Sequence, residues 1–312
     1  MQHFFENLFE RAAALPPMPT VVAHPCDASS LAGAVDAAEQ GLLSPILVGP
    51  EHRIRGVAKT EGLDISPYRL VPTEHSHASA EKSVAIIRAG EASVLMKGSL
   101  HTDEVMHEVT RKDTGLRTER RLSHVYVMQV PTYPRALMIS DGAINIYPTL
   151  EDKRDIVQNA IDLAHALGIA MPKVGILSAV ETVTPKLPST VEAAALCKMA
   201  DRGQITGGLL DGPLAFDNAI SPEAAAIKHI TSEVAGQADI LIAPDLEAGN
   251  MIAKQLTFLA NAEAAGIVLG ARVPIILTSR ADSVQARLAS CAVAAIFAAW
   301  KQGMLDAAKA EA

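Results

Sequence analysis

The chain has 312 residues and a formal net charge of −8, which argues against a general nucleic-acid binder because phosphate backbones need clustered cations. Apolar residues make up 49% of the sequence, enough for a large core, and the length predicts two domains. The three cysteines are scattered, a pattern that indicates reduced thiols. No apolar run approaches the roughly 20 residues of a membrane span, and the N-terminus lacks a signal-peptide pattern. We therefore expect a soluble, cytoplasmic protein.

Short apolar strands alternate with Ala-rich helices over the first third of the chain. This alternation predicts a parallel sheet covered on both faces. The predicted strands are 20–25 and 44–49, and the helices that follow them are 27–41 and 51–62. A helix followed by a strand is predicted over 78–99, and a further helix over 101–115, starting near Thr102.

The alternation of strands and helices stops near residue 121, where two strands, 121–130 and 135–145, are predicted to form a hairpin-like and partly antiparallel pair. The alternation then resumes. The expected helices are 151–167, 189–202, 221–235, 248–262 and 283–302, and the expected strands are 173–179, 205–212, 238–244, 266–270 and 273–278. The sequence thus predicts two α/β domains with mostly parallel sheets and a cleft between them.

Several of these strands end in polar clusters, and ligands collect at the carboxyl ends of parallel strands. The clusters are SDGAIN (Asp141, Asn145), DGPLAFD (Asp211, Asp217), PDLEAGN (Asp245, Glu247, Asn250) and TSRADS (278–283). One such ending is ordinary turn chemistry, and Asp245 could simply cap a helix. Four in one chain favour a shared ligand site.

Two of the strand endings suit a phosphate. In TSR, the hydroxyls and backbone amides at a helix start donate hydrogen bonds, and the arginine fork binds two oxygens; a surface arginine paired with Asp282 is the alternative. In MKGSLHT, Ser99 and Thr102 lie between a strand and a helix start. The following TGLRTERR brings Arg117, Arg120 and Arg121 together, which is either a second cationic group or a solvated charge run.

Other familiar chemistries lack their motifs. The sequence has no GxGxxG, GxxxxGK[ST] or GxSxG pattern. His75 and His77 could resemble a metal pair but have no third ligand at a regular spacing, so we expect no metal site. Cys26 could be a nucleophile, but a packed thiol is the simpler interpretation. His101, His107 and His124 are each more typical of structural histidines.

Taken together, these segments resemble the phosphate acetyltransferase and phosphate butyryltransferase family along nearly the whole chain. The motifs that carry the resemblance, in family order, are AHPCDASSLAGAVDAAEQGLLSPILVGPEHRIR, LMKGSLHT, RLSHVYVM, SDGAINIYP, PKVGILS, DGPLAFDNAI, PDLEAGNM and LTSRADS. TGLR…RLSHV and TSRADS are similar to the versions of the butyryltransferase-like branch.

The resemblance implies an isocitrate dehydrogenase-like fold, with a discontinuous first domain of residues 1–121 and 270–312 and a second domain of 122–269. It also implies that an acetyl or other short acyl group moves between CoA and inorganic phosphate, with no metal or bound cofactor. In the family, the serine and arginine of the SR motif bind the phosphoryl group and the thioester. Here these are Ser279 and Arg280.

We assign the remaining site residues from their positions after predicted strands and from their proximity in sequence to these motifs. The catalytic set is Ser279, Arg280 and Asp282. The phosphate or acyl phosphate would contact Thr278, Ser279, Arg280, Ser99, Thr102 and Arg117, and the CoA side of the cleft would be formed by Asp141, Asp211, Asp245 and Asn250.

Two positions depart from the acetyltransferase pattern. The aspartate seven residues after the motif serine, thought to take the thiol proton, is Ala286 here, and the arginine that follows the threonine is His107. Asp282 is the substitute base, and Arg117 or Arg121 the substitute cation, both by proximity in sequence. A thiol with a pKa of about 8.5 needs only modest help to ionise at neutral pH.

Two other functions compete with the transferase. One is a homologue that binds CoA or acyl phosphate without turnover, which Ala286 and His107 motivate. The other is a dehydrogenase on the related scaffold, which the missing dinucleotide fingerprint disfavours. The expected partners are acyl-CoA, CoA, phosphate, acyl phosphate and a second copy of the chain, with no nucleic acid and no membrane.

Overall fold

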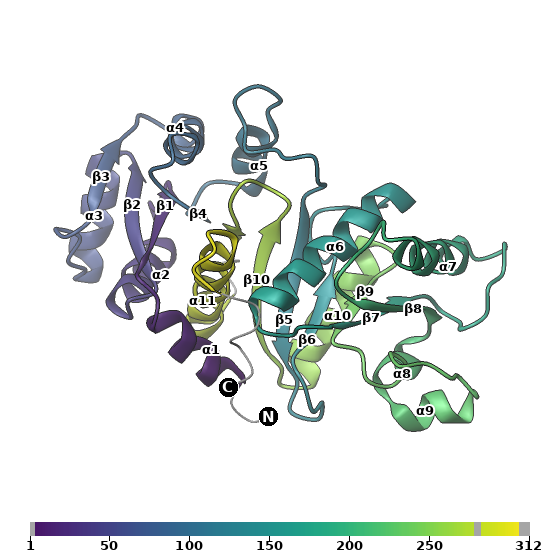
Figure 1. Ribbon diagram of the computed structural model, residues 1–312. Helices are drawn as coiled ribbons and strands as arrows, with labels where there is room; N and C mark the ends of the chain where they lie inside the picture. Colours follow the sequence, from purple (N-terminus) through teal and green to yellow (C-terminus); the bar gives the residue numbers. More distant parts are fainter. Residues whose placement is uncertain (1–3, 278–281, 306–312) are drawn as a thin grey trace. The chain divides into compact units, whose positions relative to one another are not determined.

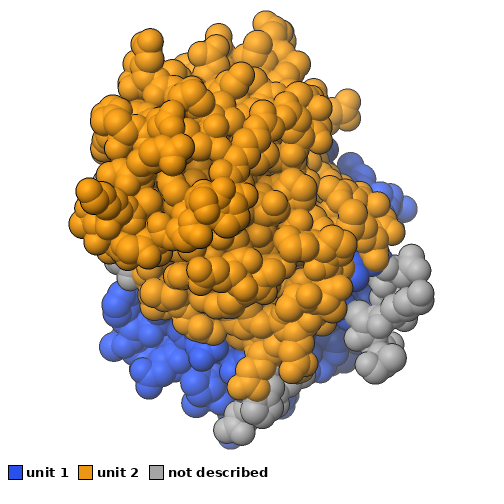
Figure 2. All heavy atoms as spheres, turned by 90° about the vertical axis from the view of Figure 1, so that its left-hand side faces the viewer, with its two compact units in different colours: residues 1–4, 121–264, 305–312 blue, residues 5–120, 265–304 orange. Residues whose placement is uncertain are grey.

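The computed structural model describes residues 4–277 and 282–305, and these form two compact units (Figures 1 and 2). The N-terminal unit contains residues 5–120 and 265–304, and the central unit is built on residues 121–264. The chain thus passes between units after Arg120 and after Ala264, whereas the sequence placed these boundaries after residues 121 and 269.

The N-terminal unit contains a parallel sheet in the order β3-β2-β1-β4-β11, with β10 antiparallel beside β11. Its strands are β1 (Met18–Ala23), β2 (Leu43–Gly49), β3 (Arg69–Pro72), β4 (Val94–Lys97), β10 (Glu263–Leu269) and β11 (Ile275–Ile276). Strand β3 was not predicted from the sequence. This strand is short and only half-buried, so it lacks the apolar run by which the others were found.

Helices of the N-terminal unit alternate with its strands along most of the chain. They are α1 (Phe4–Ala13), α2 (Ala28–Glu39), α3 (Glu51–Glu61), α4 (Ser76–Arg88), α5 (Thr102–Thr110) and α11 (Val284–Lys301). The Asp27 side chain caps α2 by accepting a hydrogen bond from the Ser30 amide. Helix α11 packs against α2, β1, β4 and β11 and is buried over most of its length, where a run of alanines allows close approach.

The central unit has a sheet in the order β5-β6-β9-β7-β8. Its strands are β5 (Ser123–Gln129), β6 (Leu137–Ser140), β7 (Lys173–Leu177), β8 (Leu209–Leu214) and β9 (Ile240–Ile242). Its helices are α6 (Leu150–Ala166), α7 (Pro188–Asp201), α8 (Phe216–Ile220), α9 (Pro222–Ile227) and α10 (Leu246–Leu259). Strands β5 and β6 pair antiparallel, as predicted, and the remaining pairs are parallel. The predicted α/β class is confirmed.

The predicted helix at 221–235 is shorter in the structure. Helix α9 ends at Ile227, and α8, immediately before it, was not predicted. His229 has a left-handed φ of 55°, which stops the helix. The Ser232 hydroxyl then accepts hydrogen bonds from the amides of Val234 and Ala235, which makes a turn in place of helix.

No helix in the described part of the chain is both long enough and apolar enough to cross a membrane.

Candidate active site

A pocket of about 630 Å³ lies in the N-terminal unit, at the carboxyl ends of β1 and β4. Its walls come from the segments that follow these two strands, from the first residues of α2, α4 and α5, and from Arg53 on α3. Ligands of parallel α/β sheets bind at this edge, and the amides at helix starts favour anions there. The pocket is therefore the best-formed part of the candidate site.

Ser99 is built into the wall of this pocket. Its hydroxyl donates to the carbonyl of His24 at 2.9 Å and accepts from the amide of Cys26 at 3.3 Å. The preceding Gly98 is required, because a Cβ there would lie 2.4 Å from the Ala23 carbonyl oxygen. The MKGSLHT segment, predicted to bind phosphate, thus lies where the chain segments that follow β1 and β4 cross closely.

Two other polar residues of the MKGSLHT segment, Thr102 and Lys97, do not line the pocket in the same way. Thr102 is the exposed first residue of α5. Lys97 turns its ammonium group onto the carbonyls of Gly98 and Leu100, each at 3.1 Å, so it holds the loop shape.

His24 and Arg53 were not singled out by the sequence. His24 is buried, adopts a left-handed φ of 59°, and contacts the Ser79 hydroxyl through Nδ1 at 2.9 Å. Its Nε2 lies 3.4 Å from Nη1 of Arg53. Burial, and then the charge of Arg53, lower the pKa of His24. Only the position of His24 directly after a strand could have been noticed in the sequence, and Arg53 carries no such signal.

Cys26 lies in the same wall as a buried thiol. Burial raises the pKa of this thiol to about 11, so it stays protonated at neutral pH and is a poor nucleophile. The structure therefore favours the packed-thiol interpretation of the HPCD motif.

Thr278, Ser279 and Arg280 lie outside the described residues, so their predicted roles stay predictions. The strand that leads to them is described: β11 runs parallel to β4, with Ile276 opposite Met96. The chain therefore leaves β11 at the sheet edge that carries the pocket.

Asp282 follows this segment, and its backbone carbonyl accepts a hydrogen bond from Nη1 of Arg287 at 2.7 Å. The residue that caps α11 is Ser283, whose hydroxyl accepts from the Ala286 amide at 3.1 Å. Asp282 is therefore not the residue that caps α11.

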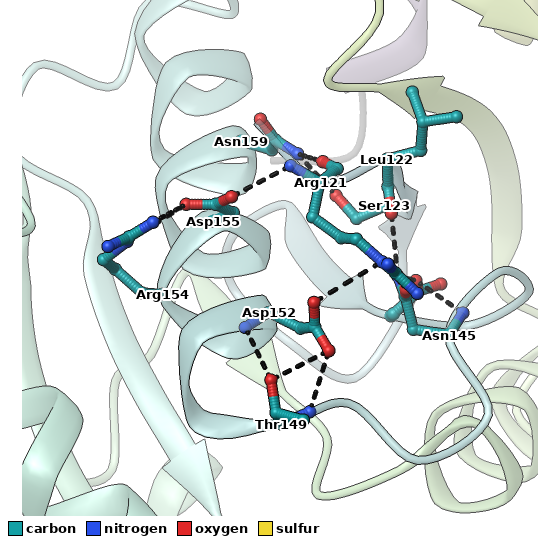
Figure 3. Close-up of polar contacts among 10 residues, drawn as sticks. Arg121, Leu122, Ser123, Asn145, Thr149, Asp152, Arg154, Asp155 and Asn159 are labelled. Atoms are coloured by element: carbon teal, nitrogen blue, oxygen red, sulfur yellow. Dashed lines mark hydrogen bonds and ion pairs between the residues drawn. The ribbon is translucent and has the colours of Figure 1, made fainter. Parts of the chain in front are cut away.

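The two candidate substitute cations differ in their surroundings. Arg117 is exposed, and its backbone pairs with Ala271 just before β11. Arg121 lies in the central unit, where Nε donates to Asn145 at 2.8 Å and lies 3.5 Å from a carboxylate oxygen of Asp152 (Figure 3). Its amide also donates to Asp155 at 2.9 Å. Arg121 thus connects β5 to α6, which leaves Arg117 as the better candidate.

His107, which occupies the family arginine position, is exposed, with Nε2 3.9 Å from Glu108. Nothing in the described residues directs it toward the pocket, so it does not replace that arginine.

Asp141 is the most buried of the four residues assigned to the CoA side. Its carboxylate accepts from the backbone amides of four residues: His124, Ala143, Ile144 and Asn145. Such a carboxylate builds the turn after β6, and it has few lone pairs left for a ligand.

The other three residues are also explained in part by local structure. Asp245 caps α10 by accepting from the Ala248 amide at 2.9 Å, as the sequence allowed. Asn250 donates to the carbonyl of Gly142 at 2.9 Å, which brings α10 onto the turn made by Asp141. Asp211 lies inside β8, which continues to Leu214, so it does not follow a strand end as predicted.

Comparison with known proteins gives the family. The family described as "Phosphate acetyl/butaryl transferase" matches residues 75–295. The chain belongs to this family. A phosphate acetyltransferase from Rhizobium meliloti is 64% identical over 97% of this chain and 96% of the relative. A phosphate butyryltransferase from Clostridium acetobutylicum is 43% identical over 84% of this chain and 87% of the relative.

A solved structure of a phosphotransacylase has a similar fold. A branched-chain phosphotransacylase from Enterococcus faecalis V583 matches with a TM-score of 0.79 and 28% identity, over 90% of this chain and 99% of that one. The family resemblance is thus confirmed. Two sequence motifs suggested the butyryltransferase-like branch, but the acetyltransferase named above shares more identity than the butyryltransferase. Those motifs do not by themselves separate the two activities.

Proposed function

We propose that the chain transfers a short acyl group between coenzyme A and inorganic phosphate, with acetyl as the preferred group and butyryl as the alternative. The observation that carries this proposal is the 64% identity to a phosphate acetyltransferase along nearly the full length of both proteins. The alternative follows from the similarity to butyryltransferases.

The reaction needs one acyl transfer and one proton transfer. In the direction of acyl-CoA synthesis, the thiol of CoA loses its proton and its sulfur attacks the carbonyl carbon of the acyl phosphate. The carbon–oxygen bond to phosphate then breaks, and inorganic phosphate leaves. The oxyanion of the tetrahedral transition state needs donors placed in advance, and we assign these to Ser279 and Arg280. Asp282 is our candidate for the group that takes the thiol proton.

This chemistry involves no oxidation or reduction, so we propose that it runs without a resident metal or cofactor. Both substrates are anions, and their repulsion must be offset by the protein. Arginine and backbone amides can do this, and both are present at the sheet edge to which β11 leads.

The direct test is phosphate-dependent release of free thiol from acetyl-, propionyl- and butyryl-CoA, with a reaction lacking phosphate as the control. We expect release only with phosphate, and the highest kcat/KM with acetyl-CoA. If no acyl-CoA reacts but calorimetry shows CoA binding, the chain is instead the inactive CoA-binding homologue.

We also propose that two copies of the chain associate through the central unit. Large apolar side chains are exposed there along α10 and in the loop before α6, namely Ile146, Tyr147, Met251, Phe258 and Leu259. Phe258 and Leu259 are each 77% exposed, which is unusual for side chains of this size. Light scattering should give a dimer for the wild type and a monomer for Phe258→Lys. Lys198→Ala, on α7 of the same unit, is the control.

We also propose that the enzyme is located in the cytoplasm. Its three cysteines are free in the structure, as expected in a reducing compartment.

A further inference from the structure

We propose that Arg53, held at the pocket by the imidazole of His24, binds a phosphate-type oxyanion of a substrate. The inference rests on the proposed function and adds an anion-binding residue that the sequence did not indicate.

The hydrogen bonds fix the tautomer of His24. Ser79 donates its only hydroxyl hydrogen to the carbonyl of His75 at 2.9 Å. Its oxygen must therefore accept from Thr73 Oγ1 at 2.8 Å and from Nδ1 of His24 at 2.9 Å. With the proton on Nδ1, Nε2 of His24 carries the lone pair and accepts from Arg53 at 3.4 Å. Burial lowers the pKa of His24, which keeps the ring neutral and suited to this acceptor role.

Arg53 is the cation of the pocket that lacks a counter-ion. Among residues 4–277 and 282–305, no carboxylate forms an ion pair with it, whereas Arg55, two residues later on α3, pairs with Glu51 at 2.8 Å. Within the described residues its guanidinium hydrogen-bonds to His24 alone, which leaves most of its donors available. A neutral partner orients Arg53 without cancelling its charge, which is the arrangement that an anion site needs.

Two carboxylates also line the pocket, and both are engaged by the protein. Asp27 accepts from the amide of Ser30 at 2.8 Å, as the cap of α2. Glu104 accepts from the hydroxyl of Ser76 at 2.5 Å and from the amide of His101 at 2.8 Å. Their charges thus face the starts of helices, so they oppose an anion beside Arg53 less than free carboxylates would.

The remaining wall and the volume also fit a phosphate group. Ala28 and Ser29, the first residues of α2, line the pocket, and amides at this position point out of the helix start. A volume of about 630 Å³ exceeds what a single phosphate fills and lies in the range of small-molecule sites. The proposed substrates offer this chemistry twice, as inorganic or acyl phosphate and as the phosphate esters of CoA.

The test compares Arg53→Met with Arg55→Met, which removes a cation from the same helix but outside the pocket. For Arg53→Met we expect KM for one anionic substrate to rise about ten-fold or more, with kcat within about two-fold and an unchanged melting temperature, because one charged donor is lost. Arg53→Lys should recover part of the affinity, and Arg55→Met should match the wild type.

The two sources of the phosphate group are distinguished by which KM changes. A rise in KM for phosphate assigns the pocket to inorganic or acyl phosphate. A rise in KM for CoA assigns it to a CoA phosphate, and dephospho-CoA, which lacks the 3′-phosphate, then tells whether that ester is the one bound.

His24→Asn tests the positioning step. Asparagine tolerates a left-handed φ and can keep the hydrogen bond to Ser79, but it has no counterpart of Nε2. We expect it to raise the same KM as Arg53→Met, by a smaller factor.

Unchanged KM values for both substrates in Arg53→Met, in a preparation whose wild type turns over, would overturn this inference and leave the proposed function intact. Absence of turnover in the wild type would contradict the proposed function instead. Calorimetric titration of CoA and of inorganic phosphate into wild type and Arg53→Met would then decide the role of Arg53: equal affinities for both ligands would overturn it, and weaker binding of one would support it.

Discussion

Arg287 connects the first turn of α11 to the segment before it, by donating a hydrogen bond of 2.7 Å to the backbone carbonyl of Asp282. The side chain is buried and passes beside Gly33 of α2, where an added Cβ would lie 3.5 Å from both Cδ and Nε of Arg287. Its Nε has no hydrogen-bond partner in the described structure. A buried, incompletely satisfied guanidinium is costly, so we infer that Arg287 fixes the residues beside the SR motif and contributes little to stability.

Replacing Arg287 with Met tests this interpretation. The variant should lose activity by about ten-fold or more, because hydrogen bonds from charged donors contribute about 1.5–3 kcal/mol. Its melting temperature should stay within a few degrees of the wild type, because the apolar stem is kept and an unsatisfied group is removed. Kinetics and thermal unfolding measured on the same preparation would check both. A large fall in melting temperature would show instead that Arg287 is needed for folding.

His124 provides a second prediction, on stability in acid. The ring is buried beside Tyr126, with ring centroids 4.3 Å apart, and burial lowers the pKa of His124 to about 4, against an opposing effect of Asp141. Since the folded pKa is below the unfolded value of about 6.5, this stability is fully present above pH 6.5 and is lost as pH falls toward 4.

The wild type should therefore lose up to about 3 kcal/mol of unfolding free energy through this histidine as pH falls from 7 to 4.5. His124→Phe keeps the ring but cannot titrate, so its loss over the same range should be smaller. Urea unfolding at both pH values measures the difference. Parallel losses in the two proteins would exclude His124 as a source of acid sensitivity.

Elements with strong local signals were predictable from the sequence. Helix α2 was found because Asp27 caps it and apolar residues repeat along it, and the β5–β6 pair was found because its register follows from two apolar runs. The helix predicted at 221–235 ends early, at Ile227, because His229 and Ser232 terminate it through backbone geometry that composition does not show.

The site residues likewise include some that were predictable from the sequence and some that were not. Ser99 was found because it follows a strand, whereas Arg53 lies on an ordinary amphipathic helix and reaches the pocket only through the packing of α3. Asp141 and Asp245 look like ligand residues in the sequence, yet both bind the backbone of their own turns. A carboxylate that caps a helix and one that faces a substrate are the same residue type at the same position after a strand, so the sequence does not distinguish them.

The third prediction concerns Arg280. Arg280→Lys should keep the fold but lose most of the activity, because lysine keeps the charge without the planar two-pronged donor. Loss of one transition-state donor costs about 2.7–4 kcal/mol, or roughly 10²–10³ in kcat. Steady-state kinetics with acetyl-CoA and phosphate provide the measurement, and circular dichroism controls for folding. A near wild-type kcat with a raised KM for phosphate would mean that Arg280 only gathers phosphate.

The last prediction concerns the proton of the CoA thiol. With Ser283 established as the cap of α11, two interpretations of Asp282 remain: it takes the thiol proton, or it orients Arg280. If Asp282 is the base, Asp282→Asn should slow the reaction of acyl phosphate with CoA at neutral pH. The loss should diminish as pH rises toward the thiol pKa of about 8.5, because solvent then supplies the thiolate directly.

The measurement is the ratio of kcat/KM between variant and wild type from pH 6.5 to 9. If Asp282 orients Arg280, the variant should instead show a raised KM for phosphate in the reverse assay, and the ratio should stay flat. Ser283→Ala serves as the control, because it removes the helix cap, at a cost of about 1 kcal/mol of stability, without changing a titratable group. A flat ratio for Asp282→Asn would exclude it as the base, and the thiol would then be ionised by a nearby cation that lowers its pKa.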